Sequence, residues 1–106
     1  MLKTSRRIDC PIPGYESAYV VLPAEWLGEH LVKRDEVLDA LPLKNATLLR
    51  ASIALAIADD WGGIPGLEQR NDPAKWELHK TPLTLLLWLV ATVYNDFERA
   101  FVIPKG

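Results

Sequence analysis

The stretch that decides the fold reads TPLTLLLWLVATVY and covers residues 81–94. It predicts a helix, because Thr81 can cap an N-terminus and Pro82 suits the first helical position. Steps of about 100° per residue from Leu83 predict one core face, which comprises Leu86, Leu87, Val90, Val93, Tyr94, Phe97 and Phe101. Leu85 and Trp88 point roughly the opposite way. The first half of this helix therefore needs cover on a second side, from the chain itself or from another molecule.

The composition is typical of one folded, soluble domain. Of the 106 residues, 25% are charged and 49% belong to the hydrophobic set, which argues against a disordered chain. The net charge is −2 and the basic residues are scattered, so there is no electrostatic footprint for nucleic acid. The apolar run at 83–94 is shorter than the roughly 20 residues that a bilayer requires. We therefore expect no nucleic-acid partner and no membrane partner.

The N-terminal sequence and the cysteine count favour a reducing cytoplasm. Cys10 is the only cysteine, so no disulfide can form within the chain. Residues 1–7 carry charge without the apolar segment of a secretory signal.

The first 22 residues are expected to be extended. Pro11, Pro13 and Gly14 exclude a helix over residues 8–14 and favour an arm or a turn. Residues 15–22 alternate loosely, which predicts a short strand paired with residues near 6–10.

Two further helices are predicted between the arm and residue 60. The first runs over residues 23–41, from Pro23 to the residue before Pro42, and its apolar side comprises Trp26, Leu27, His30, Leu31, Val37, Leu38 and Leu41. The second begins after a cap at Asn45 and has Ser52 as its only polar side chain between Arg50 and Asp59. A segment that is apolar on all sides is typical of a central buried helix.

These elements predict a mainly α fold in a single domain over residues 1–106. It has three to four helices, and its N-terminal arm over residues 1–22 forms an extended segment, a short β-strand or a hairpin. The helical body over 23–106 contains a long connection, 61–81, in which Gly62 or Gly63 caps the preceding helix and Pro65 prevents its continuation. Asp72 and Pro73 allow at most a short turn there.

No catalytic arrangement is visible among the titratable residues. His30 and Arg34 lie one helical turn apart, and a position along the edge of the core explains them better than a polar pair in a cleft. Cys10 lies between an aspartate and a proline, which does not activate a thiol. We expect no catalytic residues and no enzymatic activity.

The same residues give no reason to expect a metal ion or a cofactor. His79 lacks a second ligand at the spacing that a zinc site needs. Asp59 and Asp60 are followed by apolar residues where a calcium loop requires oxygen ligands. The glycine-rich segment after Trp61 lacks the Lys-Ser or Lys-Thr of a phosphate-binding loop.

Four tryptophans in 106 residues are the remaining signal. Tryptophan is enriched at the centres of protein interfaces, although near turns it often pins a loop to the core. Loop pinning is the preferred explanation for Trp61 and Trp76, and an interface is the preferred explanation for Trp88. The predicted protein-binding residues are Leu85, Trp88, Leu89, Trp61, Ile64, Leu67 and Trp76.

The order of short motifs carries a family resemblance. The motifs are Pro13-Gly14-Tyr15, Val21-Leu22-Pro23 before Trp26, Asp59-Asp60-Trp61, Ile64-Pro65-Gly66-Leu67, Asp72-Pro73 before Trp76, Thr81-Pro82-Leu83 before Trp88, and Phe101 before Ile103-Pro104-Lys105. In this order the chain resembles the tail assembly chaperones of long-tailed bacteriophages and prophages. The family supplies no catalytic residues that could be carried over.

The resemblance implies a helical, non-enzymatic protein that binds the tape-measure protein and aids viral tail assembly in the cytoplasm of the bacterial host. It also implies recruitment of the tail-tube protein and is compatible with a homo-oligomer. In several members a ribosomal frameshift produces a longer form. One alternative is a small structural or connector subunit of a phage particle or other complex, which stays in the finished assembly. Another is a small hydrolase or a regulatory partner of an enzyme.

Overall fold

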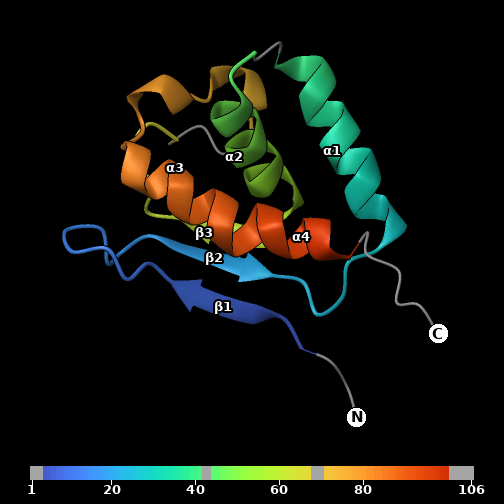
Figure 1. The fold of residues 1–106 in the computed structure, drawn as a ribbon, viewed down its shortest axis with the longest axis horizontal. Coiled ribbons are helices and arrows are strands. Elements are labelled where there is room, and N and C mark those ends of the chain that lie inside the picture. Colours follow the sequence, from blue (N-terminus) through green and yellow to red (C-terminus); the bar gives the residue numbers. More distant parts are fainter. Residues whose placement is uncertain (1–3, 42–43, 68–70, 101–106) are drawn as a thin grey trace.

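In the computed structural model, which describes residues 4–41, 44–67 and 71–100, helices cover one face of a small antiparallel sheet (Figure 1). The sheet has the order β1-β2-β3, with β1 at Arg6–Asp9, β2 at Tyr19–Leu22 and β3 at Asp60–Gly62. The α-helices are α1 (Gly28–Ala40), α2 (Ala46–Ile57), α3 (Leu83–Leu89) and α4 (Asn95–Arg99). A π-helical segment (Val90–Tyr94) joins α3 to α4, and two short 3-10 turns, η1 (Pro73–Lys75) and η2 (Leu78–Lys80), precede α3. The predicted fold class is confirmed.

The predicted pairing of the N-terminal residues is also confirmed. β1 and β2 are antiparallel, with Arg6 opposite Leu22 and Asp9 opposite Tyr19. Val20 and Leu22 are buried under the helices, whereas Tyr19 and Val21 lie on the other face of the sheet and are partly exposed. The loop between the strands is closed by the backbone N–H of Gly14, which donates to the Glu16 carboxylate at 2.7 Å. Hydrogen bonds from the backbone of Gly14 and of Glu16 itself hold the pKa of Glu16 below its ordinary value.

β3 replaces the glycine cap that the sequence predicts after the central helix. α2 ends at Ile57, and Ala58 already has extended backbone angles. Trp61 lies opposite Val20 in the sheet and is only 5% exposed, so its ring belongs to the core. Gly63 does adopt a left-handed conformation, with φ of 69°, but it follows the strand rather than the helix. The prediction of a helix cap at Gly62 or Gly63 is therefore wrong.

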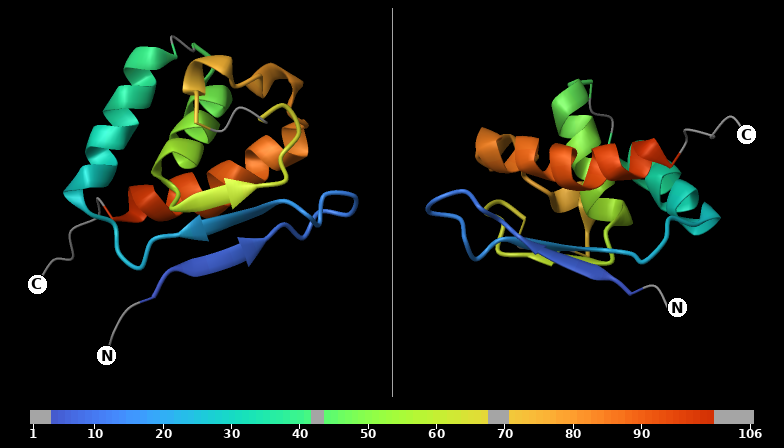
Figure 2. Two further views of the ribbon diagram at one scale, coloured as in Figure 1. Left: turned by 180° about the vertical axis from the view of Figure 1, so that it is seen from behind. Right: turned by 60° about the horizontal axis from the view of Figure 1, so that its bottom comes forward.

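α2 is the central buried helix, as predicted. Figure 2 shows it between α1 and the long helix that contains α3 and α4. The side chain of Asn45 caps it by accepting the backbone N–H of Leu48 at 3.1 Å. Its buried residues are Ala51, Ser52, Ile53, Ala54, Leu55 and Ile57. The one polar member, Ser52, satisfies its hydroxyl by donating to the backbone oxygen of Leu49 at 2.7 Å.

α1 begins five residues later than predicted and buries less of its apolar side. The residues from Pro23 to Leu27 are not helical. His30 is only 2% exposed, accepts the backbone N–H of Leu27 on Nδ1 at 2.9 Å, and packs edge-to-face against Trp26 at 5.0 Å. The imidazole is thus enclosed in the core, whereas the sequence predicts a position along the edge of the core. Within α1 only His30 and Val37 are buried.

The helix from Leu83 buries Leu86, Val93 and Phe97 of the predicted core face, but it also buries Leu85 and Leu89 and leaves Leu87 exposed. Its buried residues, apart from Leu86, recur every fourth position: Leu85, Leu89, Val93 and Phe97. A straight α-helix would rotate such a series by about 40° at each step. The π-helical segment compensates, because a π turn holds more residues than an α turn and so keeps this series on one face. Phe101, also assigned to the core face, lies outside the described residues.

The N-terminus of this helix also differs from the prediction. Pro82 immediately precedes the first helical residue, and the hydroxyl of Thr81 donates to the backbone oxygen of Pro65 at 2.9 Å instead of capping the helix. Thr81 therefore ties the start of α3 to the connection that follows β3.

Candidate protein-binding surfaces

Most of the predicted binding residues pack in the core. Leu85 and Leu89 are 0% exposed, and Ile64 and Leu67 are 5% and 3% exposed. Of the two sources of cover left open for Leu85, the chain itself supplies it, because the core encloses that side of α3. A direct contact between these four side chains and a partner would require the fold to open.

The outer side of α3 carries apolar residues that are exposed in the described part of the chain. Leu83 is 62% exposed and Leu87 is 51% exposed, although the sequence assigns Leu87 to the core face. Thr84 and Ala91 are exposed beside them, and Trp88 is half-buried. We call these five residues the α3 surface. Of the predicted binding residues on this helix, Trp88 alone contributes to it.

A groove adjoins the α3 surface at Leu83. It has a volume of about 350 Å³ and is lined by Asn45, Thr47, Leu48, Leu78, His79, Thr81, Leu83 and Leu86. No aspartate, glutamate, lysine or arginine is among these residues. A lining that combines leucines with asparagine, threonine and histidine side chains suits an apolar side chain of a partner.

Trp61 and Trp76 come together from separate parts of the chain. Their rings pack edge-to-face, with centroids 5.8 Å apart, and Trp61 Nε1 donates to the backbone oxygen of Leu55 at 2.9 Å. Trp76 is 8% exposed, so the pair pins the connection after β3 to the core, as the preferred explanation has it. Both rings also border a hollow of about 400 Å³ between α1, α2 and η1, with Lys33 and Glu36 among its lining residues.

α1 exposes a second set of apolar side chains. Leu27 is 51% exposed, Leu31 36%, Val32 57% and Leu38 37%. We call these four residues the α1 surface. The sequence marks three of them as members of the apolar side of the helix, but it cannot show that they stay exposed in the described structure.

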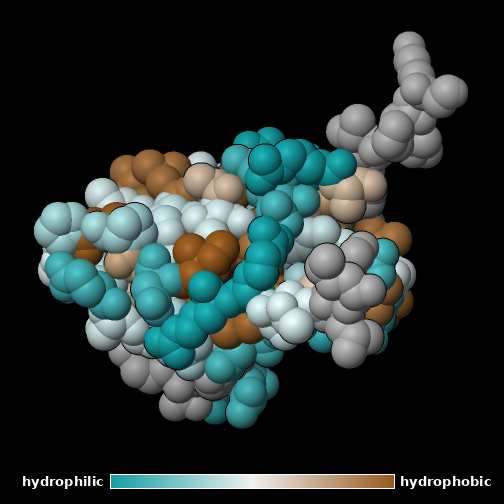
Figure 3. All heavy atoms as spheres, turned by 90° about the horizontal axis from the view of Figure 1, so that it is seen from below, coloured by the Kyte–Doolittle hydropathy of each residue, from teal (hydrophilic) through white to brown (hydrophobic). Residues whose placement is uncertain are grey.

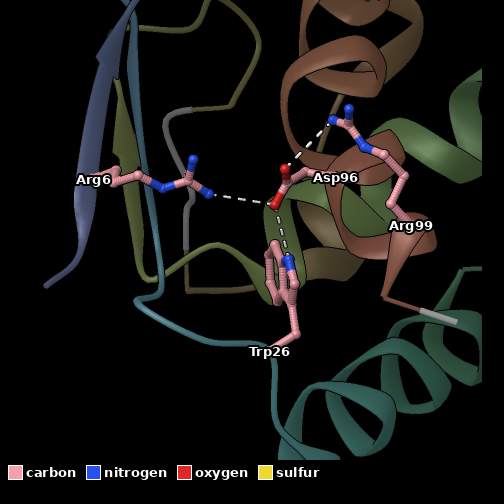
Figure 4. Close-up of polar contacts among 4 residues, drawn as sticks. All are labelled: Arg6, Trp26, Asp96 and Arg99. Carbon is pink, nitrogen blue, oxygen red and sulfur yellow. Dashed lines mark hydrogen bonds and ion pairs between the residues drawn. The ribbon is translucent and has the colours of Figure 1, made fainter. Parts of the chain in front are cut away.

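Asp96 joins three parts of the chain beside the α1 surface (Figure 4). Its Oδ2 accepts Trp26 Nε1 at 2.9 Å and the Arg6 guanidinium at 3.4 Å, and its Oδ1 accepts the Arg99 guanidinium at 3.4 Å. The Trp26 ring packs edge-to-face on Phe97 at 5.3 Å. These contacts connect β1, the segment before α1, and α4.

Substituting Asp96 tests this junction. Asp96→Ala is expected to lower the free energy of unfolding by about 1–3 kcal/mol, because the partly buried Trp26 N–H loses its acceptor. The Arg99→Ala control should cost less than about 0.5 kcal/mol, because the Arg99 side chain is 71% exposed and exposed ion pairs contribute little. Urea denaturation measures both. Equal losses for the two variants would show that the indole contact is unimportant.

Among the described residues, no three His, Cys, Asp or Glu side chains form a group that could hold a metal ion. Cys10 is 3% exposed and so is not presented to a substrate. Across the same part of the chain, every helix is too short or too polar to cross a bilayer.

Comparisons with known family models, with curated proteins and with solved structures find no match to this chain.

Proposed function

We propose that the protein is a binding protein of the tail-assembly-chaperone type, which holds the tape-measure protein of a phage or prophage while the tail assembles. The order of the short motifs supports the choice of this family. The observation that carries the proposal is the α3 surface, where Leu83 and Leu87 stand exposed one helical turn apart. A chaperone for an aggregation-prone client needs such an apolar surface on a stable body.

The shape of the α3 surface favours a helical client. Leu83 and Leu87 form a short apolar ridge, and the groove beside Leu83 is lined by no aspartate, glutamate, lysine or arginine. An amphipathic helix can place one apolar side chain in the groove while its neighbouring turn packs along the ridge. Beyond Ala91 the exposed positions on the same side become polar, with Asn95 and Arg99. The apolar contact is therefore limited to the first half of the helix.

Two substitutions on this surface test the proposal. The double variant Leu83→Asp with Leu87→Asp is expected to weaken co-purification with the tape-measure protein at least about tenfold, since loss of a central interface side chain commonly costs more than 1 kcal/mol. The far-UV circular dichroism should not change, because both side chains are more than half exposed. Sedimentation with purified client gives the change in dissociation constant.

The matched control is Leu31→Asp with Leu38→Asp on α1, which introduces the same two charges at exposed leucines of another helix. Client binding should survive in this control. If the control loses the client and the α3 variant keeps it, the client lies on the α1 surface instead.

The competing function is a structural or connector subunit. Mass spectrometry of purified particles separates the two, because a chaperone leaves the assembly and a subunit stays in it. Finding the chain in finished tails at stoichiometric amounts would overturn the chaperone proposal.

A further inference from the structure

The outer edge of β1 is unpaired among the described residues. β1 is an end strand of the sheet and pairs only with β2. The N–H of Cys10 donates to the backbone oxygen of Ala18 at 2.9 Å, and this bond sets the alternation along the strand. In an antiparallel ladder every second residue directs its N–H and C=O to the same neighbour. Arg6, Ile8 and Cys10 therefore direct their backbone N–H and C=O groups to β2. Arg7 and Asp9 direct theirs away from β2, to the free edge of the sheet.

We propose that this edge pairs antiparallel with β1 of a second copy of the chain. The two sheets then join across a two-fold axis into one sheet of six strands. Arg7 lies opposite Asp9 of the second copy, and Asp9 lies opposite its Arg7. Each of these two opposed pairs exchanges two backbone hydrogen bonds, because all four residues direct their backbone groups to the shared edge.

Charge selects this register over its neighbours. A register shift of two residues in one direction places Arg7 opposite Arg7 of the second copy. The same shift in the other direction places Asp9 opposite Asp9 of the second copy. Like charges directly opposed in a sheet are destabilising, and unlike charges are stabilising. On the other face of the sheet the chosen register brings Ile8 against Ile8 of the second copy, which adds an apolar contact. Pro11 lacks an N–H and so limits the ladder to the strand itself.

The side chains are already arranged for this pairing. Arg7 Nε and Asp9 Oδ1 lie 3.0 Å apart on the face of the sheet that the helices leave open, and their side chains are 59% and 66% exposed. The Arg7 guanidinium also lies 4.1 Å from the centre of the Tyr19 ring, which restricts its orientation. Association places a second Arg7 and a second Asp9 beside them in alternating order. Because the four charges face solvent, they set the register and leave most of the attraction to the backbone.

The charges on this edge also explain why a second copy is the preferred occupant. Proteins often protect an edge strand with charges of one sign, which repel an identical edge. Here a positive and a negative side chain alternate on one face, so an antiparallel copy of the same edge is complementary. Figure 3 views this side of the molecule and shows a hydrophilic band crossing it beside a hydrophobic patch. The inference is independent of the identity of any client.

Charge reversal tests the register. In sedimentation experiments on the full chain, Arg7→Asp and Asp9→Arg should each raise the dissociation constant of the dimer at least about tenfold, because each variant opposes like charges twice. An equimolar mixture of the two variants should associate again, because the heterodimer restores both unlike pairs. Asp39→Arg is the control, since it reverses an exposed charge on α1 and should leave the dimer intact.

A proline substitution tests the edge itself. Arg7→Pro removes a backbone N–H that faces outward and leaves the hydrogen bonds to β2 in place, so the variant should fold but stay monomeric. Circular dichroism checks the fold. The proposal is overturned if the unmodified chain is monomeric at every concentration tested, if Arg7→Pro still dimerises, or if the mixed charge variants are folded and do not associate.

Discussion

Replacing Leu85 with aspartate is expected to unfold the protein. Leu85 is 0% exposed and is among the largest fully buried side chains of the described residues. A carboxylate at this site loses its hydration without gaining a partner, which costs several kcal/mol. Domains of this size are stable by only about 5–15 kcal/mol in total. Far-UV circular dichroism should show the loss of helix, and a thermal scan should show no cooperative transition near that of the unmodified chain.

Leu87→Asp is the matched control, because the same charge then enters the same helix two residues further on. Leu87 is 51% exposed, so this variant should stay within about 0.5 kcal/mol of the unmodified chain. Leu85→Ala provides a graded version and should cost about 2–5 kcal/mol through the cavity it leaves. If Leu87→Asp unfolds the chain while Leu85→Asp is tolerated, the core face of α3 is the one that the sequence pattern predicts.

The sequence predicts those elements that composition and local residue types identify without knowledge of their packing partners. α2 is apolar on all sides, so its central position follows from composition, and Asn45 marks its start. The β1–β2 pairing follows from the prolines that exclude a helix and from the loose alternation after them. β3 has only three residues and a sequence rich in aspartate and glycine, so neither its length nor its composition indicates a strand.

The face of α3 could not be predicted for a different reason. When a helix is apolar on nearly all sides, periodicity cannot identify which side faces the core. A small error in the assumed rotation per residue then decides which residues are predicted to be buried. The π-helical segment changes that turn, and residues spaced by four stay in register with the core. No residue type or short motif at these positions indicates a π-helical segment.

The same limit applies to the binding surfaces. The sequence marks the tryptophans, and the structure shows that Trp61 and Trp76 are packed against each other and border a hollow. The exposed leucines on α1 and α3 are invisible to a pattern, since a pattern shows which side of a helix is apolar and not whether the chain can cover it.

Substituting Gly63 with alanine is expected to destabilise the protein by about 3 kcal/mol or more. Gly63 has φ of 69°, a conformation that other residues adopt only with strain. An added Cβ would lie 2.4 Å from the backbone oxygen of Ser17 and 3.0 Å from Cα of Ala18. Both neighbours are backbone atoms at the entry to β2, so relief requires the hairpin to move. Since 1 kcal/mol shifts the melting temperature of a domain near this size by about 4–8 °C, a loss above about 10 °C is expected.

Gly28→Ala is the control, because Gly28 is the first residue of α1 and an added Cβ there meets no atom within 4 Å beyond its chain neighbours and its own helix backbone. Alanine has the higher helix propensity and reduces the freedom of the unfolded chain, so this variant should be neutral or gain up to about 1 kcal/mol. If Gly63→Ala lowers the free energy of unfolding and Gly28→Ala raises it, the loss arises at the contact between Gly63 and the hairpin. A tolerated Gly63→Ala would instead mean that the end of β3 does not approach Ser17 in solution. It would also argue against the pairing of Trp61 with Val20, because both contacts involve β3 and its end.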